Sequence, residues 1–196
     1  PILDYFQDAN EETHFVIELS SYPLDALRQR PQVSILLNIV PEHLDYHGGF
    51  EAYCSAKLNI ARNQMSEDVF IINQSFSLLA DRTRKFPGRR VTFREVDDES
   101  ALVVVRDGAI FAQKLSSEPL MNVADIPVMG PGNLQNALAA ISCGVILGAS
   151  PNQIRKGIEG FVPLEHRLEF VAERAGIRFY NDSLSTIPEA LTHALE

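Results

Sequence analysis

Residues 33–40 are VSILLNIV, a run that is apolar on both faces when extended, as expected for a strand buried inside a parallel sheet. An amphipathic stretch at residues 49–64 predicts a helix, and VFIIN at residues 69–73 predicts the next strand. Strand, helix and strand at this spacing are typical of a parallel sheet with helices on its faces. The chain is therefore predicted to be an α/β protein with a mostly parallel sheet flanked by helices.

The segments around this unit extend the prediction. HFVIEL at residues 14–19 indicates a strand before it. After it, the pattern changes to short strands at residues 91–96, 101–105 and 109–113. We expect these strands to form a small antiparallel flap beside the main sheet. Asp107-Gly108, before the last of these strands, supplies the positive φ angles of a hairpin turn.

Two helices and a change of pattern follow. The apolar spacing predicts a helix at residues 133–147, and Ser150-Pro151 predicts the cap and first position of another that reaches about residue 160. After Pro163 we expect a β-hairpin at residues 167–173 and 177–180, and then a last helix that opens at Pro188. We therefore predict two domains, residues 1–163 and residues 164–196.

The composition excludes several classes of protein. The 196 residues are 45% hydrophobic and 22% charged, which is typical of a globular protein and not of a disordered one. The net charge of −9 argues against broad binding of nucleic acid, and no apolar run approaches the roughly 20 residues that span a bilayer. Cys54 and Cys143 are too few for a disulfide framework or a cysteine zinc site, which favours a reducing cytoplasmic setting. The first residues, PILD, contain neither an initiator Met nor a signal peptide, so we expect a piece of a longer chain.

Lys57 stands where an apolar residue is expected. In the predicted helix at residues 49–64 it falls in the middle of the apolar stripe formed by Phe50, Tyr53, Cys54, Leu58 and Ala61. A buried ammonium group without a partner is costly, so we expect Lys57 to pair, to shift its pKa or to be chemically changed. The alternative is a snorkelling lysine whose charged tip stays in water.

Glu18 and His43 come at or just after the carboxyl ends of two predicted strands, where open α/β sheets bind ligands. A carboxylate such as that of Glu18 suits a hard cation such as Mg²⁺. Because Lys57 lies on the helix that follows His43, we expect the three side chains to gather around one ligand. The alternative is that Glu18 and His43 are solvated residues of a strand end and a loop.

Two further clusters could bind a ligand. GPGNLQN at residues 130–136 is a glycine-rich turn that opens a helix and could present backbone N–H groups to an anion, with Asn133 and Asn136 on one face. Its glycine spacing is not that of a dinucleotide fingerprint, and the alternative for Asn133 is a plain helix cap. Arg167 and Asp182 could clamp a ligand between two domains or form an inter-domain salt bridge.

In this order, the motifs resemble the Mur ligases, the ATP-dependent amide-forming enzymes of peptidoglycan precursor synthesis. ELSS (18–21), NIVPEHLD (38–45) and AKL (56–58) resemble their P-loop NTPase-like central domain, and NLQNALAA (133–140) resembles their adenine-side helix. PLEHRLE (163–169) and NDS (181–183) resemble the start of their Rossmann-like C-terminal domain. HRLEF (166–170) and NDS fit best the branch that adds D-glutamate to UDP-N-acetylmuramoyl-L-alanine. A sibling that adds diaminopimelate or lysine, which shares HLDYHG (43–48), is the alternative.

The resemblance implies a role for each candidate residue. Glu18, His43 and Lys57 would be metal-site residues, and Lys57 would be the lysine that family members carbamylate. His43 would also lie near the substrate carboxylate, which gives Lys57 and His43 catalytic roles. Ser20 would touch the muramoyl substrate, and Thr186 would lie near the incoming amino acid. The implied cofactors are ATP and Mg²⁺, and the residues implied to contact ATP are Asn133, Asn136, Arg167 and Asp182.

The chain also departs from the family pattern. Leu184 stands where some members have lysine, and Gly132 stands where a histidine is often found. The family's phosphate loop, Gly-x-x-Gly-Lys-[Ser/Thr], has no counterpart, since the chain contains no Gly-Lys pair. Because the lysine and backbone of that loop hold the ATP phosphates, we expect the chain to be inactive by itself. A non-catalytic remnant that serves as a binding module is the remaining alternative.

Overall fold

The computed structural model describes residues 2–128, 130–183, 185 and 192. Its strands are β1 (Val33–Leu36), β2 (Val69–Asn73), β3 (Arg89–Arg94), β4 (Val103–Arg106), β5 (Ala109–Ala112), β6 (Met121–Asn122), β7 (Glu169–Arg174) and β8 (Ile177–Asn181). Its α-helices are α1 (Ser21–Asp25), α2 (Leu44–His47), α3 (Phe50–Arg62), α4 (Ser77–Arg82), α5 (Pro131–Ile146) and α6 (Pro151–Glu159), and its 3-10 helices are η1 (Ile2–Asp8) and η2 (Val123–Asp125). The strands form a six-stranded sheet in the order β1 to β6 and a separate two-stranded sheet of β7 and β8.

The main sheet is parallel from β1 to β4 and antiparallel from β4 to β6. This confirms the predicted α/β class and corrects one detail of it. The short strands expected as a flap beside the sheet are a continuation of the sheet, because β3 pairs directly with β2 and β4 pairs with β3. Asp107 and Gly108 form the predicted turn between β4 and β5, with φ angles of 49° and 74°.

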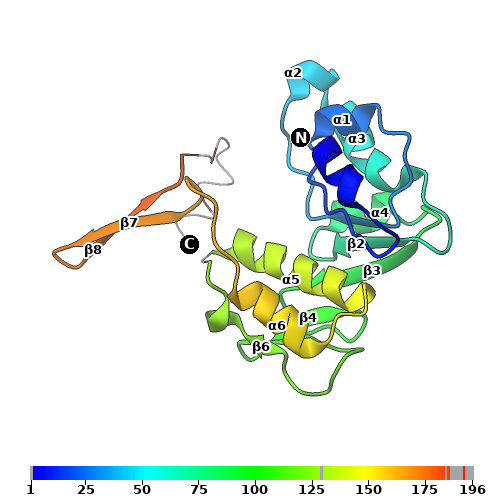
Figure 1. The fold of residues 1–196 in the computed structure, drawn as a ribbon. Helices are drawn as coiled ribbons and strands as arrows, with labels where there is room; N and C mark the ends of the chain where they lie inside the picture. Colours follow the sequence, from blue (N-terminus) through cyan, green and yellow to red (C-terminus); the bar gives the residue numbers. More distant parts are fainter. Residues whose placement is uncertain (1, 129, 184, 186–191, 193–196) are drawn as a thin grey trace.

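Helices cover both faces of the sheet (Figure 1). Phe70 and Ile72 of β2 belong to the core beneath α3 and α4, whereas Ile71 belongs to the core beneath α5 and α6. The whole of β2 is buried, as its apolar sequence predicts for a strand covered on both sides. The helices predicted at residues 49–64, at 133–147 and after Ser150 are confirmed as α3, α5 and α6. In the described part of the chain, none of the helices combines the length and the apolar character needed to traverse a bilayer.

Residues 14–19 are not a strand, contrary to the prediction. They lie outside both sheets, and Phe15, Val16 and Ile17 are exposed by 37%, 89% and 50%. A strand needs a neighbour that completes its ladder of hydrogen bonds, and β1, at the edge of the sheet, is joined to β2 as its described neighbour. Apolar alternation therefore predicts where a strand is possible but does not supply its partner. β1 is also shorter than residues 33–40, because its register with β2 covers Val33–Leu36.

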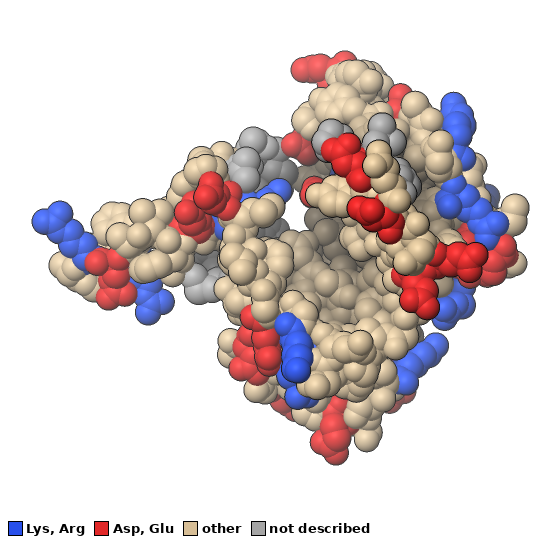
Figure 2. All heavy atoms as spheres, in the orientation of Figure 1, with Lys and Arg blue, Asp and Glu red and all other residues tan. Residues whose placement is uncertain are grey.

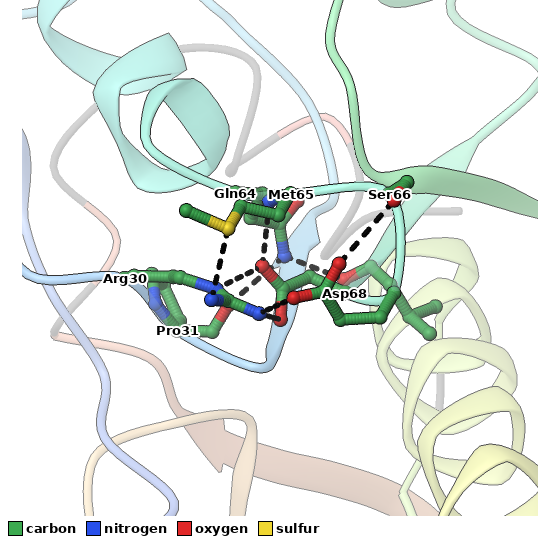
Figure 3. Close-up of polar contacts among 8 residues, drawn as sticks. Arg30, Pro31, Gln64, Met65, Ser66 and Asp68 are labelled. Atoms are coloured by element: carbon green, nitrogen blue, oxygen red, sulfur yellow. Dashed lines mark hydrogen bonds and ion pairs between the residues drawn. The ribbon is translucent and has the colours of Figure 1, made fainter.

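An ion pair holds the loops that lead into β1 and β2 (Figure 3). The Arg30 guanidinium donates from Nε to Asp68 Oδ2 and from Nη2 to Asp68 Oδ1, the latter over 2.9 Å, and the Asp68 side chain is 3% exposed. Beside this pair, Gln64 donates from Nε2 to the carbonyls of Pro31 and Val69 over 3.1 and 2.8 Å. These contacts fix the amino ends of the first two strands, opposite the edge from which the loop after β1 emerges.

The β7–β8 hairpin projects away from the body of the molecule (Figure 1). It confirms the hairpin predicted around Ala175-Gly176, which have φ angles of 52° and 78°. Asp182 Oδ1 accepts a hydrogen bond from the Leu168 N–H over 3.1 Å and so closes the base of the hairpin. The helix expected from Pro188 and the candidate residue Thr186 lie outside the described residues.

Candidate functional site

Three segments carry the residues of the candidate site. The segment before α1 carries Glu18 and Ser20, the loop after β1 carries His43, and α3 carries Lys57. His43 adopts the left-handed conformation at the start of α2, with a φ of 53°. Gly48-Gly49, with φ angles of 77° and 128°, makes the tight turn that folds α3 back after α2, a conformation that glycine adopts at low cost.

The Lys57 side chain is half-buried, and two carboxylates act on its charge. Burial lowers the pKa of the Lys57 ammonium group below its ordinary value, while the negative charges of Glu42 and Glu18 oppose that shift. Lys57 Nζ also lies 5.5 Å from the centroid of the Tyr53 ring, which is a cation–π distance. The structure thus places Lys57 where the charge of Glu18 acts on it, together with the charge of Glu42, a residue that did not stand out in the sequence.

His43 is connected to this group through Glu42. Its Nε2 lies 3.7 Å from Glu42 Oε1, and its ring centroid lies 4.9 Å from that of Tyr22. The side chains of His43 and Glu42 are 37% and 33% exposed, so a ligand can reach them. Glu42 therefore lies beside His43, and its negative charge also acts on the Lys57 ammonium group. The one sequence feature that could have indicated a role for Glu42 is its position directly before His43.

The segment that carries Ser20 is held in place by α1, which follows it. Ser21 Oγ lies 2.9 Å from His47 Nε2 on α2. The buried side chain of Asn59 on α3 donates from Nδ2 to the Leu24 carbonyl over 3.0 Å. Ser20 itself is exposed and its side chain makes no capping bond to α1, so its hydroxyl is open to a ligand.

Aromatic rings from α1, α2 and α3 lie next to these groups. The ring centroids of Tyr22 and Tyr46 are 4.5 Å apart in an edge-to-face arrangement, and that of His47 lies 4.8 Å from Tyr46 and 5.5 Å from Tyr53. Tyr53 is 1% exposed, and burial, helped by the negative charge of Glu42, raises the pKa of its phenol to about 12. Tyr22 and Tyr46 could not be singled out in the sequence, because exposed tyrosines on separate segments form no periodic pattern.

The donors of this site are of the kind that Mg²⁺ binds. Glu18 and Glu42 offer carboxylate oxygens, and Mg²⁺ is commonly held by one or two carboxylates together with phosphate oxygens and water. Among the residues that the structure describes, no group of three or more His, Cys, Asp or Glu side chains is placed to hold a metal ion by itself.

The glycine-rich segment begins α5, but its turn is limited to Gly130: the helix starts at Pro131, so Asn133 lies inside its first turn and is not its cap. Gly130 precedes the helix with a φ of 93°, and Asn136 Nδ2 lies 3.5 Å from Asn133 Oδ1, so both asparagines share one face of the first turns. Asn136 is exposed and Asn133 is half-buried. The surface is hollowed between α5 and the helices α1 to α3 (Figure 2).

The other two predicted nucleotide contacts lie at the base of the hairpin. Arg167 is exposed, whereas Asp182 accepts hydrogen bonds from the Leu168 N–H and the Ser185 hydroxyl. Asp182 therefore has a structural task that its sequence position did not reveal. Among the described residues, the charges that act on the pKa of Lys57 are those of Glu42 and Glu18, and neither Arg167 nor Asp182 contributes.

A family model for the Mur ligase middle domain matches residues 3–144. This chain belongs to the Mur ligase family. The matched range contains the segments that carry Glu18, Ser20, His43 and Lys57, as well as most of α5.

This Mur ligase chain is similar to several proteins named UDP-N-acetylmuramoylalanine--D-glutamate ligase. It is 36% identical to the one from Koribacter versatilis over 100% of its own length and 44% of that protein. It is 39% identical to the one from Geobacillus kaustophilus over 92% of its own length and 40% of that protein. The chain thus spans less than half the length of these curated relatives.

Solved structures of Mur ligases have the same fold. MurF from Acinetobacter baumannii matches 88% of this Mur ligase chain with a TM-score of 0.69, which covers 38% of MurF at 24% sequence identity. MurF from Thermotoga maritima in complex with ADP matches 85% of the chain with a TM-score of 0.62, which covers 38% of that protein at 18% identity. These likenesses confirm the fold predicted from the sequence.

Proposed function

We propose that this chain is part of an ATP-dependent ligase that joins D-glutamate to UDP-N-acetylmuramoyl-L-alanine in peptidoglycan precursor synthesis. The observation that carries this proposal is the match of 36% identity over the whole chain to a ligase of that name. The grouping of Lys57 with two carboxylates and His43 supports it, because phosphoryl and acyl transfer need charged groups fixed where negative charge develops. A cytoplasmic location is part of the proposal, and the free thiols of Cys54 and Cys143 favour it.

The proposed reaction has two steps. The terminal carboxylate of UDP-N-acetylmuramoyl-L-alanine attacks the γ-phosphorus of ATP, so that ADP leaves and an acyl phosphate forms. The amine of D-glutamate then attacks the acyl carbon, and phosphate leaves from a tetrahedral intermediate. Mg²⁺ held by Glu18, His43 and a carbamylated Lys57, with the charge of Glu42 beside them, would supply charge neutralisation for the phosphoryl and carboxylate oxygens.

The chain's own residues would prepare the acceptor carboxylate. The neutral Lys57 amine would add to CO₂ and lose one proton, which converts a half-buried cation into an anion that can orient a metal ion. The lowered pKa of Lys57 favours this addition, because it increases the neutral fraction of the amine. His43 would hold the substrate carboxylate, Ser20 would contact the muramoyl group, and Thr186 would lie near the incoming amino acid.

ATP would bind along the N-terminus of α5. Asn133 and Asn136 would contact the adenine, and Arg167 and Asp182 would contact the ribose and phosphates. We assign residues 1–163 and 164–196 to two domains in this proposal, with the nucleotide between them. Since the sequence contains no Gly-Lys pair, a P-loop lysine would come from residues outside this chain.

The test is phosphate release by the complete protein that contains this chain. ATP, UDP-N-acetylmuramoyl-L-alanine and D-glutamate should support turnover. The product of that reaction, which already carries D-glutamate, should not support turnover when it is supplied with ATP and L-lysine or meso-diaminopimelate. Lys57→Met should lower turnover about 100-fold, whereas Lys85→Met, at an exposed lysine in the loop before β3, should leave it unchanged. Turnover with lysine or diaminopimelate would assign the protein to the sibling branch, and no turnover with any acceptor would favour a binding module.

A further inference from the structure

The turn at residues 164–169, which runs into β7, has an unusual backbone conformation on both sides of Arg167. His166 and Leu168 have φ angles of 68° and 46°, which lie in the left-handed region. There the Cβ atom of a residue other than glycine crowds the following carbonyl, so each of the two residues costs free energy. Other contacts must therefore hold the turn in this conformation.

A carboxylate from the first residue of β7 bonds back to this turn. Glu169 Oε2 accepts a hydrogen bond from the His166 N–H over 2.8 Å. Asn181, the last residue of β8, supports the same pair, because its Nδ2 lies 3.4 Å from Glu169 Oε2 and 2.7 Å from His166 Nδ1. The Glu169 side chain is 38% exposed, so a charge-assisted hydrogen bond that is partly shielded from water holds the amino side of the turn.

The backbone of Arg167 is fixed, whereas its side chain is exposed. The Arg167 N–H donates to the Leu164 carbonyl over 3.3 Å, and the next N–H, that of Leu168, donates to Asp182 Oδ1 over 3.1 Å. No residue of the described ranges pairs with the Arg167 guanidinium. A guanidinium binds phosphate oxygens through two parallel bonds in one plane, so its affinity depends on the direction in which the backbone points the side chain.

We propose that Glu169 is a positioning residue for Arg167. By accepting the His166 N–H, it keeps the turn left-handed and directs the Arg167 guanidinium toward the phosphates of the nucleotide. This inference rests on the proposed function, in which Arg167 contacts ATP. Positioning needs only an acceptor oxygen, which glutamine also has, whereas a metal ligand or a general base would need the charge. A residue that only stabilises the hairpin would change the thermal midpoint and not the affinity for the nucleotide.

The experiment is steady-state kinetics on the complete protein that contains this chain. Glu169→Ala should raise the KM for ATP about tenfold, with kcat and the KM values for UDP-N-acetylmuramoyl-L-alanine and D-glutamate within about twofold of wild type. Glu169→Gln keeps an acceptor oxygen and should restore most of the affinity for ATP. Glu173→Gln is the matched control and should change nothing, because Glu173 is an exposed carboxylate of the same strand that lies 3.4 Å from Arg178.

The variant Arg167→Ala tests whether Glu169 acts through the guanidinium. Alone, it should raise the KM for ATP at least about tenfold. Adding Glu169→Ala to it should change that KM by less than about twofold, because both substitutions remove the same contact. Additive effects would overturn the inference. It would also be overturned by an unchanged KM for ATP in Glu169→Ala, by a rise in the KM for the acceptor instead, or by loss of activity in Glu169→Gln.

Calorimetric binding of AMP-PNP, an ATP analogue that transfers no phosphoryl group, separates this inference from the proposed reaction. Weaker binding by Glu169→Ala, restored in Glu169→Gln, in a protein that does not ligate D-glutamate would overturn the reaction and support the positioning role. Wild-type binding by Glu169→Ala in an active ligase would overturn the positioning role alone. Thermal unfolding of each variant checks that it is folded before binding is measured.

Discussion

Replacing Asn59 with alanine should release α1 from α3 and lower the free energy of unfolding by about 1.5 kcal/mol. Asn59 is 6% exposed, and its Nδ2 donates to the carbonyls of Leu24 over 3.0 Å and Asp25 over 3.3 Å. Two such bonds contribute about 1 kcal/mol each. The full sum is not reached for two reasons. Leu24 O also accepts from the Leu27 N–H, and Asn59 Oδ1 is buried without a hydrogen-bond partner, so its removal relieves a cost.

Urea unfolding followed by circular dichroism measures this loss, which corresponds to a fall of about 0.7 M in the midpoint. Amide hydrogen exchange should accelerate at residues 18–25, because α1 anchors the segment that carries Glu18 and Ser20. Asn63→Ala is the matched control, since Asn63, the residue that caps the C-terminus of α3, donates to the Arg28 carbonyl over 3.0 Å but is exposed. Water can replace that bond, so the control should lose less than about 0.5 kcal/mol. Equal losses for the two variants, or unchanged exchange at α1, would refute the reasoning.

The remaining predictions concern the frame of the sheet. A methyl group at Gly88 would lie 2.7 Å from Gln64 Oε1, and Gln64 cannot move away easily because its Nε2 donates to two backbone carbonyls. Gly88→Ala should therefore lower the free energy of unfolding, measured in urea, by about 1–3 kcal/mol. Gly157→Ala should instead stabilise the protein by about 0.5–1 kcal/mol, because this helical glycine has open space around it; a loss there would contradict the helix-propensity argument. The Arg30 guanidinium holds the pKa of the Asp68 carboxyl below its ordinary value. The Asp68 carboxylate therefore stabilises the fold above the pKa of the unfolded chain, and this contribution is lost as the pH falls through the lower pKa of the folded state. Asp68→Asn should make the urea midpoint less dependent on pH below about pH 4. If the variant and the wild type show the same dependence of the midpoint on pH, the Arg30–Asp68 ion pair does not contribute to stability in this way.

Several residues of the candidate site could be singled out in the sequence, because a charged residue at a position where the local pattern requires an apolar one is easy to recognise. Lys57 interrupts an apolar helical stripe, and the structure finds it half-buried, with Glu18 close enough for its charge to act on the amine. His43 was expected beyond the end of a strand and lies in the loop after β1. Each of these predictions depends on one periodic segment and on the residues that end it. Both can be read from neighbouring positions in the sequence.

Other features could not be predicted because they depend on neighbours that are distant along the chain. Residues 14–19 have the composition of a strand, yet they lie outside both sheets. Asp182 was predicted to contact nucleotide, and it also closes the hairpin base through the Leu168 N–H. A strand or a polar contact forms only where a second segment offers the complementary hydrogen-bonding groups.

The sequence alone determined the α/β class, the positions of α3, α5 and α6, and the presence of an amine where an apolar side chain belongs, because periodicity records which face of each element is buried. Only the tertiary structure decided that the charges of Glu42 and Glu18 act on Lys57, that Asn59 ties α1 to α3, and that Tyr22 and Tyr46 meet beside the site. The physical reason is that these contacts join separate segments. Their formation depends on how the helices pack at the end of the sheet, and no one segment carries that information.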